Sequence, residues 1–250
     1  MDRLLEATAR AERDHFWFRG FRGFVAPLLE RAAGGQRDLV SLDCGCGTGH
    51  NLAMLRRFGR AFGIDITLSG LQYAASRGDR HVARASAASL PFPGDAFDLV
   101  TSFDVIYSLP DDLEREAAAE MFRVLKPGGH LVLNAAALEA LRGNHSVLSS
   151  EVRRYSKASL TKVLEDAGFQ IRWISYTNAT ILPLLLAVRL VQRITGHEES
   201  PAEISLPPAP VNLVLSGLLK LEATALRWVG MPAGSSVLCL AQKPASSRGL

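Results

Sequence analysis

The stretch Leu42-Asp43-Cys44-Gly45-Cys46-Gly47-Thr48-Gly49 decides the fold that this sequence predicts. It follows a short β-rich run at residues 38–43 and precedes residues 51–58, whose apolar positions have helical spacing. The glycines let the backbone turn sharply and approach a ligand with no Cβ in the way. The helix that follows begins with unpaired N–H groups. The stretch therefore predicts a parallel strand, a ligand-binding loop and a helix.

Outward from this loop, strand and helix patterns alternate. Lys126-Pro127-Gly128-Gly129 is a turn signal before the fifth strand. Alternation of this kind predicts βαβ units and an α/β fold with a doubly wound, mostly parallel sheet. Strands are expected at residues 38–43, 60–65, 81–83, 98–103 and 130–135, and helices at residues 51–58, 69–76 and 113–125.

The pattern changes after residue 135. A helix capped by Ser156 and ended by Gly168 comes first. Residues 169–176 and 236–241 each alternate like a strand with one solvent-facing side. Between these strands we expect a helical insertion at about residues 181–230, with a Pro-rich loop and a second helix at residues 211–229.

Composition narrows the class of protein. The 250 residues carry 28 Lys and Arg against 25 Asp and Glu, and 48% are hydrophobic, which excludes a disordered chain. No run of Lys and Arg provides a phosphate-neutralising patch, so nucleic acid is not an expected partner. The three cysteines cannot all pair and no secretory leader is evident, which predicts a reduced cytoplasmic protein. The uncharged stretches at residues 173–188 and 204–219 are too short, and too interrupted by proline, to span a membrane.

Two carboxylates indicate the ligand. Asp43 ends the first strand, where it would repel a pyrophosphate but suits a cationic group. Asp65 ends the second strand, where nucleoside-binding folds hold ribose hydroxyls. A dinucleotide loop would read GxGxxG, whereas here His50 follows Gly49 and the third glycine is one residue early. An adenosine that lacks phosphate and carries positive charge describes S-adenosylmethionine.

The runs LDCGCGTG, GID, LPFPGDAFDLVTS and RVLKPGGHLVL, within residues 38–135, resemble the class I S-adenosylmethionine-dependent methyltransferases of the small-molecule type, similar to methyltransferase types 11 and 12. The resemblance implies a Rossmann-like sheet of seven strands, with helices on both faces, an antiparallel last strand and a helical insertion before it. It also implies S-adenosylmethionine as cofactor and S-adenosylhomocysteine as product. We expect one domain over residues 1–250: a helical lid at 1–36, a cofactor-binding core at 37–135 and a substrate-side half at 136–250.

The resemblance implies a set of cofactor-binding residues. The first loop would hold the methionine part, the end of the second strand the ribose and adenine, the residues after the third strand the adenine amine, and the end of the fourth strand the methyl-transfer centre. An aromatic N-terminal run, HFWF, would cover the cleft. In that order, these residues are Asp43, Gly45, Cys46 and Gly47; Asp65 and Ile66; Ser86 and Ala87; Phe103 and Asp104; and Trp17 and Arg19.

Catalytic candidates lie in two segments that resemble a subset of the same family. In GNHSVLSSEVRRYS, His145 and Tyr155 match that subset, while Glu151 stands where a second histidine is expected. His15 belongs to the HFWF run. A base is needed only if the acceptor must lose a proton, because alignment with the sulfonium supplies much of the acceleration. The structural alternatives are that the arginines pair with acids, that Tyr155 packs and that the N-terminal aromatics dock a helix. No metal is expected.

We therefore predict methyl transfer by in-line displacement to a small, apolar or amphipathic acceptor. The Leu- and Val-rich insertion would cover the substrate, lie on a membrane surface, pack on the core or contact a second subunit. A non-catalytic S-adenosylmethionine-binding module is one alternative. An NAD-dependent dehydrogenase is another, disfavoured by the early third glycine and by the lack of a lysine four residues after any tyrosine.

Overall fold

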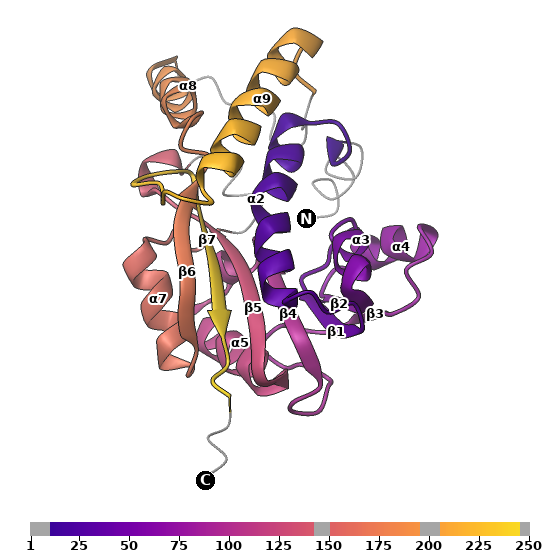
Figure 1. Ribbon diagram of the computed structural model, residues 1–250. Coiled ribbons are helices and arrows are strands. Elements are labelled where there is room, and N and C mark those ends of the chain that lie inside the picture. Colours follow the sequence, from indigo (N-terminus) through magenta and orange to yellow (C-terminus); the bar gives the residue numbers. More distant parts are fainter. Residues whose placement is uncertain (1–10, 143–150, 196–205, 246–250) are drawn as a thin grey trace.

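The computed structural model describes residues 11–142, 151–195 and 206–245 (Figure 1). Its strands are β1 Leu39–Cys44, β2 Gly59–Asp65, β3 Val82–Arg84, β4 Phe97–Phe103, β5 Leu125–Ala136, β6 Gln170–Thr177 and β7 Ser236–Gln242. The α-helices are α2 Phe16–Ala33, α3 Leu52–Leu55, α4 Leu68–Ser76, α5 Asp111–Val124, α7 Lys157–Asp166, α8 Leu182–Thr195 and α9 Ala209–Ala225. Short 3₁₀ turns occur at η1 Arg56–Phe58, η2 Ile106–Ser108 and η3 Glu139–Leu141.

The strands form one seven-stranded sheet in the order β3-β2-β1-β4-β5-β7-β6. β1 to β5 pair in parallel, whereas β7 is antiparallel to both of its neighbours, β5 and β6. The order reverses between β1 and β4, and open α/β sheets bind ligands at the carboxyl ends of the strands at such a switch point. The predicted fold class, mostly parallel with an antiparallel last strand, is confirmed.

Two hydrophobic cores cover the two faces of the sheet. Alternate residues of a strand point to opposite faces. Val237 and Cys239 of β7 pack with α5 and α7, while Leu238 and Leu240 pack with α2 and α9. The sequence pattern predicted one solvent-facing side for residues 236–241, and this was wrong. β7 lies between β5 and β6, so every residue from Ser236 to Ala241 is buried.

The predicted turn at Lys126-Pro127-Gly128-Gly129 also differs in the structure. β5 begins at Leu125 and includes all four residues, rather than beginning at residue 130. Gly128 has a φ of +83°, and the pairing with β4 shifts register between Phe97 and Leu99. The turn residues are therefore used as an irregularity within the strand.

α2 and α9 lie side by side across one face of the sheet (Figure 1). They approach closely because Gly20 has no side chain: an added Cβ would overlap Leu219. The second half of α2 belongs to the core, with Phe24, Val25 and Leu29 buried. The second half of α2, which the sequence predicted as part of an N-terminal lid, is thus a core helix. Only the first turns of α2 reach the ligand-binding edge of the sheet.

The helical insertion occurs as predicted, as α8 and α9. Glu222 of α9 is 1% exposed and accepts hydrogen bonds from the backbone N–H groups of Ala179 and Thr180 at 3.0 and 2.9 Å. These donors precede α8, so the carboxylate of α9 anchors its start. Within the described parts of the chain, no helix is long and apolar enough to cross a membrane.

Candidate functional site

The glycine loop between β1 and α3 has backbone angles that favour glycine. Gly45, Gly47 and Gly49 have φ values of +84°, +49° and +78°, in the left-handed region. An added Cβ at Gly45 would overlap Val105 Cγ2, and one at Gly49 would lie 2.8 Å from Ala74 Cβ. The loop therefore packs directly against the segment after β4, and its backbone lines the cavity described below.

Asp65, at the end of β2, holds this loop. Its Oδ2 accepts a hydrogen bond from the backbone N–H of Gly47 at 2.8 Å, and its Oδ1 accepts one from the N–H of Thr67, also at 2.8 Å. The sequence predicted a ligand role for this carboxylate. In the structure the same carboxylate also fixes the glycine loop.

Asp43 lies beneath the loop and is fully buried. Its Oδ1 accepts a hydrogen bond from Thr101 Oγ1 at 2.6 Å, whereas Oδ2 has no hydrogen-bond partner among the described residues. Burial raises the pKa of Asp43 to about 7; the hydrogen bond from Thr101 opposes this shift, and the nearby carboxylate of Asp65 adds to it. A buried carboxylate oxygen without a partner is costly unless a cationic or donor group is brought to it.

The cavity at this edge of the sheet has a volume of about 580 Å³. One wall is the glycine loop, and the opposite walls come from the start of α2, the end of β4 and α8. Its apolar lining includes Trp17, Phe18, Phe21, Phe103, Tyr107, Leu141, Leu185 and Val188. Its polar lining includes Glu12, Arg22, Thr48, His50, Asp104, Glu151, Arg154, Arg189 and Gln192. One cavity thus joins the glycine loop to an aromatic and aliphatic surface.

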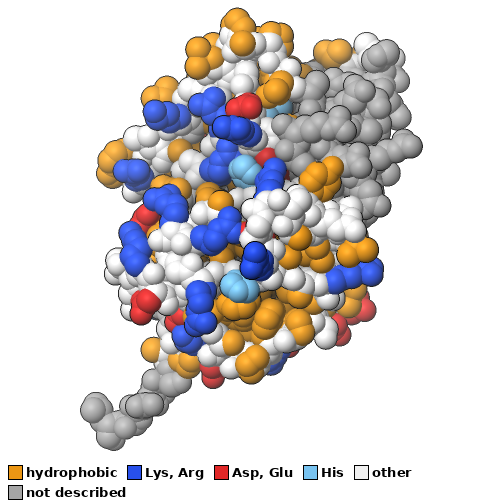
Figure 2. Space-filling model, turned by 90° about the vertical axis from the view of Figure 1, so that its right-hand side faces the viewer, with side chains coloured by type: hydrophobic (Ala, Val, Ile, Leu, Met, Phe, Trp, Pro, Cys, Tyr) orange, Lys and Arg blue, Asp and Glu red, His pale blue; other side chains and the backbone are white. Residues whose placement is uncertain are grey.

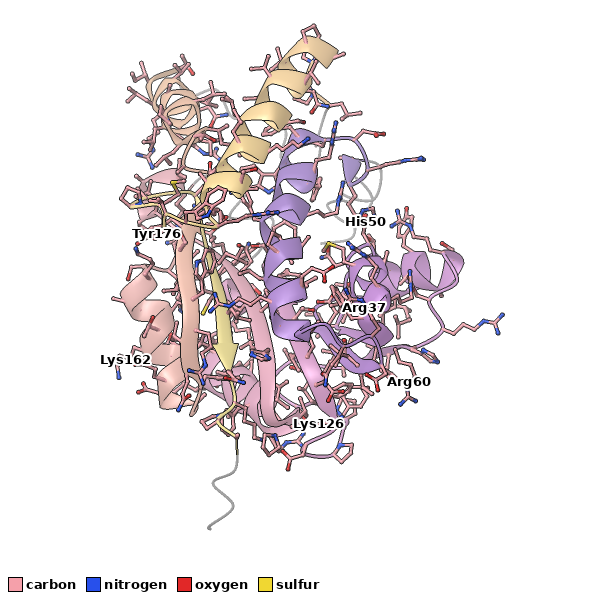
Figure 3. The ribbon with its side chains drawn as sticks, viewed as in Figure 1. Arg37, His50, Arg60, Lys126, Lys162 and Tyr176 are labelled. Carbon is pink, nitrogen blue, oxygen red and sulfur yellow. The ribbon has the colours of Figure 1, made fainter. Side chains whose placement is uncertain are left out.

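A polar network fastens the N-terminal segment to the glycine loop. Glu12, 8% exposed, accepts a hydrogen bond from Thr48 Oγ1 at 2.7 Å. His50 lies on the side of α2 that faces α3 and α4 (Figure 3), with its ring nitrogens 3.0 Å from Arg22 and 3.2 Å from Arg77. Burial, followed by these two guanidinium groups, lowers the pKa of His50 to about 4. The imidazole is therefore neutral at pH 7, and Arg22 is a cationic group in the cavity wall.

Asp104 follows β4 with a φ of +60°, a backbone conformation that is strained for a residue with a side chain. Asn134 Nδ2 donates to its Oδ1 at 2.8 Å, which leaves Oδ2 available. The residue is exposed and lines the cavity. Desolvation by the surrounding protein raises the pKa of Asp104 to about 6, with the hydrogen bond from Asn134 opposing the shift and the charge of Glu151 adding to it. A strained, anchored carboxylate in the cavity is typical of a functional site.

His15 lies in the cavity wall as the N-cap of α2. Its Nδ1 accepts a hydrogen bond from the backbone N–H of Trp17 at 3.2 Å, and its ring stacks on Phe16. Burial lowers its pKa, so the ring is neutral. Because Nδ1 is the acceptor, Nε2 carries the ring proton. His15 can donate a hydrogen bond into the cavity, but this arrangement does not make it a base.

Tyr155 is not in the cavity wall. It is 3% exposed, and its hydroxyl donates to Glu114 Oε1 of α5. Burial and this carboxylate raise the pKa of Tyr155 far above the usual range. The structure therefore corrects the predicted catalytic role, because the hydroxyl is both occupied and inaccessible. His145, the other candidate from this segment, lies outside the described residues.

Glu151 and Arg154 form a paired group in the cavity wall. Arg154 Nε and one terminal nitrogen donate to the two oxygens of Glu151 at 2.6 and 2.9 Å, and Arg154 also donates to the carbonyl of Ala137 at 2.9 Å. Such bidentate pairs are geometrically specific. The acid found where the resemblance expected a histidine thus orients the arginine.

The remaining predicted residues lie beside the cavity or away from it. Ile66 and Ser86 follow the carboxyl ends of β2 and β3, and neither they nor Ala87 line the cavity. Asp43 and Asp65 are not part of its lining either. Arg19 is exposed, and Arg22 takes the place expected for it. Arg22 lies four residues after Phe18, on the same helix face, whereas Arg19 does not. This spacing is the signal that could have identified Arg22. A substrate-covering insertion was one expectation from the sequence, but no local signal singled out Leu185 and Gln192 of α8.

The site fits the cofactor that the sequence predicts. The glycine loop lines the cavity with backbone at Gly45 and Gly47, and the Oδ2 of Asp43, just before this loop, has no hydrogen-bond partner among the described residues. Asp104 and Arg22 line the same cavity, and Asp65 accepts a hydrogen bond from Gly47 of the loop. Asp65 is suited to hydroxyl groups and Arg22 to a carboxylate, which are groups that S-adenosylmethionine carries.

Substituting Asp43 tests how much its buried carboxylate lowers the free energy of unfolding. Because the folded protein binds the proton of Asp43 more tightly than the unfolded chain, the free energy of unfolding falls as the pH rises from about 4 to 7 and stays low above it. Asp43→Asn is expected to raise the free energy of unfolding by about 1–4 kcal/mol at pH 8 and by much less at pH 4.5. Urea unfolding at the two pH values measures the difference. Asp166→Asn changes an exposed carboxylate and should leave the free energy of unfolding unchanged at both pH values. An equal effect of Asp43→Asn at both pH values would contradict the raised pKa assigned to Asp43.

Comparisons with known proteins show what this chain is similar to. A family profile described as a methyltransferase domain matches residues 42–133, which run from the glycine loop to β5. A Mycolicibacterium smegmatis protein described as a "Probable S-adenosylmethionine-dependent methyltransferase" is 32% identical over 162 residues. That match covers 63% of this chain and 61% of the relative, so the chain spans about three fifths of the relative's length.

Two further matches extend the likeness. A ubiquinone/menaquinone biosynthesis C-methyltransferase of Shewanella halifaxensis is 27% identical over 60% of this chain and 72% of its own length. The structure of Haemonchus contortus phosphoethanolamine N-methyltransferase 2 in complex with S-adenosyl-L-methionine shares the fold, with a TM-score of 0.61 and 19% identity. The structural match covers 98% of this chain and 57% of the Haemonchus contortus chain.

Proposed function

The chain belongs to the class I S-adenosylmethionine-dependent methyltransferase family, and on that premise we propose that it transfers a methyl group from S-adenosylmethionine to a small, apolar or amphipathic acceptor. One observation carries the proposal: the glycine loop opens into the same cavity of about 580 Å³ as the aromatic and aliphatic side chains of α2, β4 and α8. A cavity of this kind can hold cofactor and acceptor together.

The chain's residues have distinct tasks in this proposal. The glycine loop, Asp43 and Asp65 hold the cofactor, and Arg22 binds its carboxylate. When bound, S-adenosylmethionine supplies an electrophilic methyl group on a sulfonium. The apolar walls exclude water and align the acceptor for in-line attack. This alignment asks for no covalent intermediate on the protein.

Asp104 would take the acceptor's proton if one must be lost. Its Oδ2 is available, Asn134 fixes its orientation, and its pKa of about 6 leaves it ionised at pH 7 but close enough in pKa to accept a proton. His15 is less suited to accept this proton because its Nδ1 caps α2, and Tyr155 is less suited because its hydroxyl is buried against Glu114. A catalytic role for His145 stays a prediction.

The acceptor class is tested by measuring the release of S-adenosylhomocysteine with an amphipathic set and a polar set of acceptors. We expect turnover with phenols or quinols that carry an alkyl chain and none with ethanolamine or glycine. Asp104→Asn should lower kcat by about 100-fold or more, the lower limit for a lost proton acceptor, and leave S-adenosylhomocysteine affinity within about threefold. Turnover confined to the polar set would overturn the acceptor class. Cofactor binding without turnover on any acceptor would favour a non-catalytic binding module.

A further inference from the structure

The exposed hydrophobic side chains of this protein gather on one part of the fold. Within the described parts of the chain, every large hydrophobic residue that is exposed lies in α8, α9 or their flanking loops, except Ile66, Leu68 and Val152. Figure 2 shows hydrophobic side chains at the upper end of the molecule, where α9 begins in Figure 1. A patch of this kind on a folded protein marks a surface that meets a partner.

The exposed residues form stripes along both helices. On α9, Val211, Val214, Leu218 and Leu221 recur at intervals of three and four, which places them on one face. The adjoining face, with Leu215 and Leu219, is buried against α2 and the sheet. On α8, Leu184, Val191 and Ile194 form a similar stripe, with Ile194 75% exposed. We name these seven outward residues the apolar stripes.

The described parts of the insertion carry four cationic residues, Arg189, Arg193, Lys220 and Arg227. Lys220 and Arg227 are exposed, whereas Arg189 lines the cavity and Arg193 donates to the carbonyl of Ala140 at 3.0 Å. The carboxylate of Glu222 is buried and anchors α8. Trp228, 77% exposed, follows Arg227. Helices that combine aliphatic stripes with flanking cations and an exposed tryptophan are typical of segments that lie in the interface of a lipid bilayer. The sequence of residues 196–205 contains three glutamates, so we expect apolar contact to supply most of the binding.

We propose that the apolar stripes of α8 and α9 dock this protein onto a lipid surface. A second copy of the chain fits them less well. α8 has no buried residue, and α9 packs on α2 along one face, so the apolar stripes lie on two separate helices that extend above the sheet (Figure 1). A stable dimer needs a closely packed surface of about 800 Å² per partner. A fluid bilayer accepts two projecting helices without such complementarity.

The position of α8 connects this surface with the cavity. Leu185, Val188 and Gln192 line the cavity, whereas the stripe of the same helix faces outward. α8 is therefore a single-helix wall between the proposed lipid surface and the proposed acceptor site. An acceptor dissolved in the lipid would have a short path into the cavity; only this last step rests on the proposed function.

Vesicle flotation tests the docking surface. The full chain is expected to float with phosphatidylcholine vesicles, and more strongly with vesicles that also contain phosphatidylglycerol. The double variant Val214→Glu, Leu221→Glu should lower the partition coefficient at least tenfold, because it places two charges in the apolar stripes. Leu68→Glu is the matched control, since Leu68 is 56% exposed but lies on α4, and it should float like the wild type.

A thermal melt and a measurement of the oligomeric state separate failed docking from other causes. Stabilisation by S-adenosylhomocysteine in a thermal melt should be equal in the three proteins, so a folding defect or a failed cofactor assignment is distinguishable from failed docking. Wild-type protein that stays with neither vesicle type, or a double variant that floats equally well, would overturn the proposal. A wild-type dimer that the double variant dissociates, without vesicle binding, would assign the stripes to a second copy instead.

Discussion

Gly45→Ala is expected to abolish cofactor binding and to destabilise the fold. Gly45 has a φ of +84°, and an added Cβ would overlap Val105 Cγ2. The left-handed backbone costs an alanine about 1–2 kcal/mol, and overpacking a close contact adds about 1–3 kcal/mol. The loop must therefore move away from Val105, which displaces the backbone that forms the cradle. Urea unfolding and a titration with S-adenosylhomocysteine measure the two effects.

Gly35→Ala is the matched control for this change. Gly35 has nearly the same φ, +87°, but nothing lies within 4 Å of its added Cβ. We expect it to lower the free energy of unfolding by about 1–2 kcal/mol, from backbone strain alone, and to leave cofactor affinity unchanged. If the two variants proved equal in stability and in S-adenosylhomocysteine affinity, the close approach of the glycine loop to Val105 would have no functional meaning.

Asp65→Ala is expected to weaken S-adenosylhomocysteine binding by about 100-fold or more. Hydrogen bonds that involve a charged group contribute about 1.5–3 kcal/mol each, and the change removes the acceptors proposed for the ribose. It also frees Gly47, whose N–H Asp65 holds at 2.8 Å. Calorimetric titration of wild type and variant gives the ratio.

Asp65→Asn separates these two roles. The amide oxygen of asparagine can still accept from Gly47, so the loop is kept while the charge and one acceptor are lost. We expect an affinity between those of the wild type and Asp65→Ala. Asp166→Ala, which removes an exposed carboxylate on α7, should bind like the wild type. An unchanged affinity in Asp65→Ala would mean that this carboxylate does not touch the cofactor.

The cofactor half of the fold was predictable from sequence because its signals are local. The strand, the glycine turn and the helix are adjacent in the chain, so the residue pattern alone places Asp43 and Asp65 at strand ends. The turn predicted at residues 126–129 is an exception, because the structure builds these residues into β5.

The rest depended on contacts between distant segments. Tyr155 was chosen from a local motif, but its environment is set by Glu114, 41 residues away. Arg19 directly follows the aromatic run in the sequence, but it is exposed, whereas Arg22, one helical turn after Phe18, lines the cavity. The buried position of β7 follows from its insertion between β5 and β6. An alternating pattern alone does not distinguish such a strand from one at an edge of the sheet.

The desolvated carboxylates at the site oppose folding. Burial raises the pKa of Asp43 to about 7, and Asp104 has both a raised pKa and a strained backbone. Such features persist where a ligand uses them. The same residues that we expect to destabilise the free protein are therefore those that we assign to the cofactor and the acceptor.

The most direct test of the central claim, a cofactor site at the glycine loop, is a calorimetric titration of the wild-type chain with S-adenosylhomocysteine and, separately, with NAD. The account predicts one S-adenosylhomocysteine site per chain, with micromolar or tighter affinity corresponding to about −8 kcal/mol, and no heat of binding with NAD. Binding of NAD in place of S-adenosylhomocysteine, or of neither, would contradict it.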